Sequence, residues 1–135
     1  MINEKSFNSA LLIATEKCNI DIVKYLNEQC HADVNIKDKN GKTPLYIAIE
    51  NGNIEFIKYL VEQGHSDVNI KDENGETPLH IATKNYSIVI VKYLVEQCHA
   101  NVEAKNKRGK TPKEMVSEDA NDSNLIEIVK YFKYK

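Results

Sequence analysis

The stretch from Asp72 to Ala82 reads Asp-Glu-Asn-Gly-Glu-Thr-Pro-Leu-His-Ile-Ala, and most of the chain repeats it. Thirty-four residues earlier, residues 38–48 read Asp-Lys-Asn-Gly-Lys-Thr-Pro-Leu-Tyr-Ile-Ala, and 34 residues later, residues 106–112 read Asn-Lys-Arg-Gly-Lys-Thr-Pro. Self-similarity at a period of about 20 to 50 residues is typical of stacked repeat proteins, in which no single unit buries its apolar face alone.

Each central copy carries the start signals of a short helix. The Asn-Gly pair tolerates the positive φ angle that a tight hairpin turn requires. In the third copy Thr77 is a candidate N-cap, and Pro78 follows at the first helical position, where its missing N–H costs nothing. These signals predict short first helices over residues 44–51 and 78–84. A second, amphipathic helix is expected after each, beginning near Ile54 in the second copy.

Residues 77–82, Thr-Pro-Leu-His-Ile-Ala, match the Thr-Pro-Leu-His-x-Ala signature of the ankyrin repeat. The chain therefore resembles the ankyrin-repeat family, over almost its whole length. The resemblance implies an all-α solenoid of four stacked helix-turn-helix units joined by β-hairpin-like loops. We expect one ankyrin-repeat domain over residues 1–135, with units at about 4–37 (N-terminal cap), 38–71, 72–105 and 106–135 (C-terminal cap).

The two end units depart from the pattern. Phe7 stands where the hairpin Gly is found in the other copies, and Lys113 replaces the leucine that the central copies should bury. Four extra polar residues are inserted within Glu118–Asn124. Capping units of repeat proteins are expected to be atypical in this way. Whether the chain ends there or is cut from a longer array stays open.

Composition and charge argue against several classes of protein. A net charge of −2 predicts no general attraction to nucleic acid or to an anionic membrane. The longest apolar run near the start, Ala10–Ala14, is too short for a signal-peptide core or a membrane span. Cys18, Cys30 and Cys98 should lie too far apart to pair, which favours a cytoplasmic or otherwise intracellular location.

His31, His65 and His99 recur in identical phase, and Cys30 and Cys98 precede two of them. Soft ligands in a row suggest a metal site. The repeat, however, sets them about 10 Å apart along the stack, whereas zinc needs ligands at about 2.0 to 2.3 Å. We therefore expect no metal and no cofactor. A histidine just beyond a helix C-terminus is also favoured by the helix dipole.

No catalytic set is present, so we expect no enzyme activity: the sequence lacks a phosphate-binding glycine loop, a His-Glu-x-x-His motif and a nucleophile elbow. His80 belongs to the repeat signature, and the family resemblance implies that it forms hydrogen bonds between units. Tyr46 stands at the equivalent position one unit earlier.

The hairpin tips read as basic in the second unit, acidic in the third and strongly basic in the fourth. A solvated edge would explain such short charge runs. The family resemblance instead implies protein binding by these tips and by the concave face of the first helices. On that interpretation the partner-binding residues are Lys39, Asn40, Lys42, Glu50, Asn51, Glu73, Asn74, Glu76, Lys84, Asn85, Tyr86, Lys107, Arg108 and Lys110.

Tyr86 takes the place of Gly52, and Val89 takes the place of Glu55. One interpretation is a slightly different turn in which Tyr86 folds over Val89. The other is a binding hot spot, because tyrosine is enriched at hot spots.

The sequence thus predicts a monomeric, noncatalytic module that binds another protein. Two alternatives remain. The chain could be a structural spacer or a fragment of a longer ankyrin array, or it could contact nucleic acid through the basic edge from Lys105 to Lys113.

Overall fold

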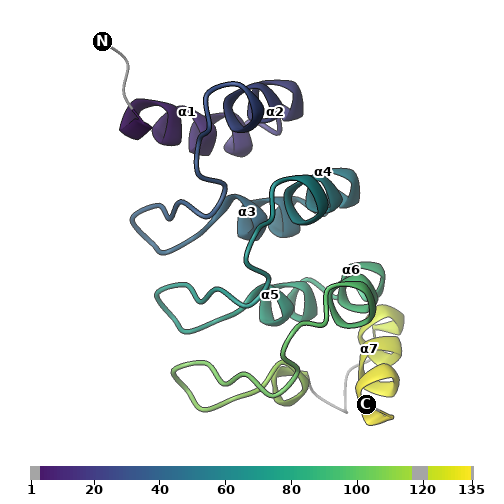
Figure 1. Ribbon diagram of the computed structural model, residues 1–135. Helices are drawn as coiled ribbons and strands as arrows, with labels where there is room; N and C mark the ends of the chain where they lie inside the picture. The colour runs from purple at the N-terminus through teal and green to yellow at the C-terminus, as the bar shows by residue number, and fades with distance from the viewer. Residues whose placement is uncertain (1–3, 117–121, 135) are drawn as a thin grey trace. The chain divides into compact units, whose positions relative to one another are not determined.

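The computed structural model describes residues 4–116 and 122–134 (Figure 1). These residues form helices and turns, with no strand among them, and the predicted all-α fold is confirmed. Residues 118–121 of the expected polar insertion lie outside the described residues. The helices are, in chain order, α1 (Glu4–Glu16), α2 (Ile20–Glu28), α3 (Pro44–Asn51), α4 (Ile54–Lys58), η1 (Tyr59–Gln63), α5 (Pro78–Lys84), α6 (Ile88–Lys92), η2 (Tyr93–Gln97), η3 (Lys113–Met115) and α7 (Ser123–Lys133).

The chain divides into two compact units, residues 1–67 and 68–135. In the first unit α1 packs against α2 and α3, and α3 packs against α4 and η1. The π-helical turn η1 continues α4 without a break. Leu11, Val23, Leu45, Phe56 and Leu60 are fully buried in this unit.

In the second unit α5 packs against α6, η2 and the short 3-10 helix η3, and α6 packs against α7. The π-helical turn η2 continues α6 as η1 continues α4. Leu79, Val91, Leu94 and Ile128 are fully buried. Lys113, where the central repeats have a buried leucine, is exposed.

The predicted first helices are confirmed as α3 and α5, with the expected bounds. Their ends are set locally: the Thr43 hydroxyl accepts the Tyr46 N–H at 3.3 Å, and the Thr77 hydroxyl accepts the His80 N–H at 3.4 Å. Without the Gly and Pro signals, α1 begins earlier in the repeat phase than α3 and α5 do.

The expectation of a different turn at Tyr86 is wrong. Tyr86 has a φ of 57°, in the same left-handed region as Gly52 at 69° and Cys18 at 55°. The hydrogen bonds also match, because Tyr86 N–H donates to Thr83 O at 3.1 Å and Gly52 N–H donates to Ile49 O at 3.0 Å. Tyr86 thus adopts the left-handed conformation that glycine adopts in the preceding repeat, at the backbone cost that a side chain carries there.

Candidate functional site

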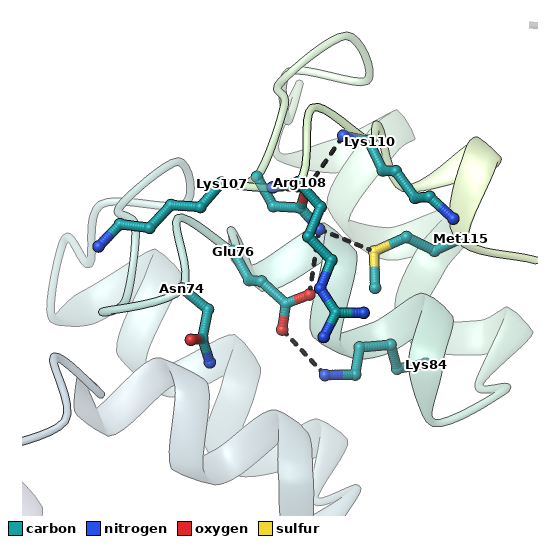
Figure 2. Close-up of a pocket in the computed structure, with 8 residues that line it drawn as sticks. Asn74, Glu76, Lys84, Lys107, Arg108, Lys110 and Met115 are labelled. Atoms are coloured by element: carbon teal, nitrogen blue, oxygen red, sulfur yellow. Dashed lines mark hydrogen bonds and ion pairs between the residues drawn. The ribbon is translucent and has the colours of Figure 1, made fainter.

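A cleft of about 360 Å³ lies between the two hairpin loops of the second unit (Figure 2). One loop spans residues 72–76 and the other spans residues 106–110, and a backbone hydrogen bond joins them, from Lys107 N–H to Asn74 O at 3.0 Å. Lys84 closes the cleft from the last turn of α5, and Met115 from η3. The lining residues are Asn74, Glu76, Lys84, Asn106, Lys107, Arg108, Lys110 and Met115.

Each loop is held by the side chain of its first residue. One Asp72 carboxylate oxygen accepts the N–H groups of Asn74 at 2.8 Å and Glu76 at 2.9 Å. The Asn106 side-chain oxygen accepts those of Arg108 at 2.9 Å and Lys110 at 3.1 Å in the same way. The loops are therefore folded by their own sequence, as Asx turns generally are.

Gly75 allows the two loops to approach each other. Its φ is 74°, and a Cβ at this position would lie 2.9 Å from the backbone nitrogen of Lys107. Any other residue would both strain the turn and push the loops apart.

Glu76 was expected as an exposed tip residue, but the structure buries it, with 5% of its surface exposed. Its carboxylate accepts hydrogen bonds from the Lys84 ammonium at 2.9 Å and from the Asn106 amide at 3.4 Å. A buried carboxylate needs such partners, because an unpaired one loses its hydration without compensation. Glu76 therefore forms the floor of the cleft.

The rim of the cleft is cationic. Lys107, Arg108 and Lys110 are all exposed, and within residues 4–116 and 122–134 no carboxylate pairs with any of them. Lys84, in contrast, is already paired with Glu76. Three positive charges are thus available to a ligand above a floor whose single carboxylate is compensated.

His80 joins the cleft to the core. It is fully buried, and its Nδ1 accepts the Thr77 N–H at 3.1 Å. The Nδ1 atom must then carry a lone pair, so the proton is on Nε2, which donates to the Lys110 carbonyl at 2.9 Å. As the resemblance implied, His80 bonds one repeat to the next, and it fixes the end of the 106–110 loop.

The predicted residues fall into three groups. Those brought together at the cleft are Asn74, Glu76, Lys84, Lys107, Arg108 and Lys110. Glu73, Asn85 and Tyr86 belong to the same unit but do not line it. Lys39, Asn40, Lys42, Glu50 and Asn51 belong to the first unit.

In the first unit the Lys42 ammonium lies 3.4 Å from the Glu50 carboxylate and 5.1 Å from the centre of the Tyr46 ring. This pair occupies the same repeat positions as Glu76 and Lys84, with the signs of the charges exchanged. Successive repeats thus display opposite charge at equivalent positions.

Sequence reasoning missed Asn106 and Met115 as lining residues. Asn106 had a signal, because it occupies the loop-organising position where the other repeats have Asp38 and Asp72. Met115 had none: it stands at the phase of Ile81, a core position in α5.

His31, His65 and His99 share a left-handed backbone, with φ of 56°, 58° and 54°. Histidine is one of the few side chains enriched in this conformation, which gives a structural reason for the repeated residue. Within the described residues, no group of three or more His, Cys, Asp or Glu side chains is placed to hold a metal ion.

None of the helices in the described part of the chain is both long enough and apolar enough to span a bilayer. A search among curated proteins gave no significant match. A family model described as ankyrin repeats (three copies) matches residues 2–72 and again residues 64–134. Two matches that together span nearly the whole sequence agree with the 34-residue period and with the paired helices. The chain therefore belongs to the ankyrin-repeat family.

Proposed function

We propose that this chain is a noncatalytic, monomeric, intracellular module that binds a partner protein through its hairpin loops and the neighbouring first helices. Ankyrin repeats are generally protein–protein interaction modules. We further propose that the four units, 4–37, 38–71, 72–105 and 106–135, act as one ankyrin-repeat domain. The observation that carries the proposal is the cleft between loops 72–76 and 106–110, with its cationic rim.

The rim favours an acidic partner segment. Because Glu76 is compensated by Lys84 and Asn106, its charge offsets little of the field of Lys107, Arg108 and Lys110. An arginine guanidinium binds a carboxylate through two parallel hydrogen bonds, which gives both strength and orientation. Loops already held by Asx turns and by His80 would lose little conformational entropy on binding.

The remaining predicted residues would set the register of the partner. The more exposed members of the two ion pairs, Glu50 and Lys84, carry opposite charges at equivalent repeat positions. A partner with the complementary alternation would be attracted in one register, and like charges would oppose it in the other. Tyr86 and Asn85 would add contact area beside α5.

The test compares partner capture by three forms of the full chain from nuclease-treated cell lysate at physiological salt. The first is the wild type, the second has Lys107, Arg108 and Lys110 all changed to Glu, and the third is a matched control. The control carries Lys5→Glu, Lys17→Glu and Lys133→Glu, which change the net charge equally at exposed positions that do not line the cleft. We expect a protein captured by the wild type and the control to be lost from the cleft variant.

Equal capture by the cleft variant would contradict the proposal. A species captured only from lysate that has not been treated with nuclease, and lost from the cleft variant, would instead favour nucleic acid on the same basic edge. Circular dichroism of all three proteins must give the same helix content, because the changed residues are exposed and do not belong to the core.

A further inference from the structure

The first repeat exposes an apolar face that does not belong to the cationic cleft. Ile13 of α1 is 54% exposed, and Ile22 and Tyr25 of α2 are 47% and 61% exposed. Single exposed apolar side chains are common on protein surfaces, but three from two packed helices form a patch.

The same repeat positions are covered in the next repeat. Ile47, Phe56 and Tyr59 stand 34 residues after Ile13, Ile22 and Tyr25, and they are 8%, 0% and 8% exposed. In the first unit the preceding repeat buries these three residues, because α1 packs against α3 and α2 contacts Tyr59. The patch on the first repeat is thus a stacking face without a neighbour among the described residues.

The covering helix also makes specific polar contacts. The Tyr59 hydroxyl donates to the Glu28 carboxylate at 3.0 Å, and the Lys24 ammonium lies 5.3 Å from the centre of the Tyr59 ring. Lys24 and Glu28 are four residues apart, so they lie on one side of α2.

The arrangement recurs in the second unit. The Tyr131 hydroxyl donates to the Glu96 carboxylate at 3.2 Å, and the Lys92 ammonium lies 5.9 Å from the centre of the Tyr131 ring. In both units a tyrosine at this phase is therefore bound by a Lys-x-x-x-Glu pair of the preceding repeat. Within the described part of the chain, no group bonds the Tyr25 hydroxyl.

We infer that the face formed by Ile13, Ile22 and Tyr25 binds a helical repeat of a partner protein. That repeat would present a Lys-x-x-x-Glu pair to Tyr25 and apolar side chains to Ile13 and Ile22. The site is distinct from the cationic cleft, and its chemistry is the one that this chain uses twice between its own repeats.

A second copy of the chain fits this face poorly. Its Lys24 with Glu28 and its Lys92 with Glu96 are already engaged by Tyr59 and Tyr131. Lys58 and Glu62 also have interactions of their own. In the last repeat Lys130 is followed, four residues on, by Tyr134 in place of glutamate.

The test supplies a repeat of known chemistry. A copy of residues 4–37, whose Lys24 and Glu28 are separated from Tyr59 in the isolated repeat, is joined through a flexible Gly-Ser linker ahead of residue 4 of the full chain. A single repeat does not bury its apolar face alone, so the copy should fold only if it docks. We expect hydrogen exchange in α2 of the host chain to slow by at least about tenfold and the copy to unfold in one transition with the rest.

Two variants of the fusion identify the contacts. Changing both Lys24 and Glu28 to Ala within the added copy should remove most of the protection, because Tyr25 of the host then has no polar partner. Ile22→Lys in the host should abolish docking, and it is tolerated because Ile22 is already half exposed. An unfolded copy with unchanged exchange in α2 of the host would overturn the inference.

Sedimentation equilibrium of the unmodified chain tests whether a second copy of the chain occupies this face. We expect a monomer at all concentrations, because the chain has no matching pair to offer. A dimer that Ile22→Lys dissociates would assign the face to a second copy and would overturn the assignment to a partner protein.

Discussion

Ser66 carries a buried hydroxyl that has no hydrogen-bond partner within the described part of the chain. The equivalent residues 34 positions before and after it are Ala32 and Ala100, which are also buried. Leaving a buried polar group unpaired costs about 1 to 3 kcal/mol. We therefore expect Ser66→Ala to raise the free energy of unfolding by about 1 kcal/mol. Urea denaturation measures the change, with Ala32→Ser as the reverse control, and a less stable Ser66→Ala would contradict the prediction.

Tyr86 and Gly52 offer a second test at the scale of one residue. Both have positive φ in equivalent turns, and a Cβ at Gly52 would have nothing within 4 Å, so only backbone strain distinguishes the two residues there. Non-glycine residues in this conformation cost about 1 kcal/mol or more. Tyr86→Gly should stabilise the fold by about 0.5 to 1 kcal/mol, and Gly52→Tyr should destabilise it by a similar amount.

Thermal and urea unfolding of both variants measure these effects. If Tyr86→Gly and Gly52→Tyr changed the free energy of unfolding in the same direction, the side-chain contacts of Tyr86 would outweigh its backbone strain. Tyr86 remains a predicted binding residue, and a strained residue that lowers stability is a reason to examine function at that position.

At the scale of one element, the 106–110 loop explains why residue 106 is Asn where the other repeats have Asp. The Asn106 amide donates to the buried Glu76 carboxylate, whereas an aspartate would face it with a second negative charge. We expect Asn106→Asp to lower the free energy of unfolding by about 2 kcal/mol or more at pH 7.

Asp72→Asn is the matched control for Asn106→Asp, because it keeps the oxygen that holds the other loop. We expect it to change stability much less. Because like charges favour protonation of one carboxyl group, the loss in Asn106→Asp should shrink as the pH falls. A variant as stable as the wild type at pH 7 would refute this role of Asn106.

The contact between η2 and α7 predicts a pH dependence. Burial, and then the hydrogen bond to Glu96, raise the pKa of Tyr131 to about 12, from an ordinary value of about 10. The folded state holds this proton more tightly than the unfolded chain does. The contribution to stability is therefore complete below pH 10 and is lost as the pH rises toward 12.

Absorbance titration of the phenolate gives the measurement. Tyr131→Phe should remove one late-ionising phenol. Glu96→Gln should lower the pKa of Tyr131 only in part, because burial is the larger cause. An unchanged titration curve for Tyr131→Phe would contradict this account of the contact.

The elements differ in how far the sequence predicts them. The bounds of α3 and α5 were predictable because Thr77, Pro78 and their equivalents act within a few residues of the helix start. The burial of Glu76 was not, because its partner Asn106 lies 30 residues further along the chain. The backbone of Tyr86 was missed because the local preference of a tyrosine disfavours the left-handed conformation that this turn contains.

At the scale of the whole molecule, this short repeat protein has two candidate binding surfaces. The cationic cleft belongs to residues 68–135, and the apolar face of Ile13, Ile22 and Tyr25 belongs to residues 1–67. We propose that the cleft recognises charge and that the apolar face recognises a helical repeat, so a substitution at one should leave binding at the other unaffected, as is usual for sites without shared partners.

The most direct test of the proposed binding module is a hydrogen-exchange footprint of the chain in complex with the protein it captures. We expect the backbone amides of residues 72–76 and 106–110 to exchange more slowly in the complex, and the Lys107, Arg108 and Lys110 to Glu variant to show no such protection. Protection confined to α1 and α2, with the two loops unchanged, would contradict the central claim that the cationic cleft is where this protein binds its partner.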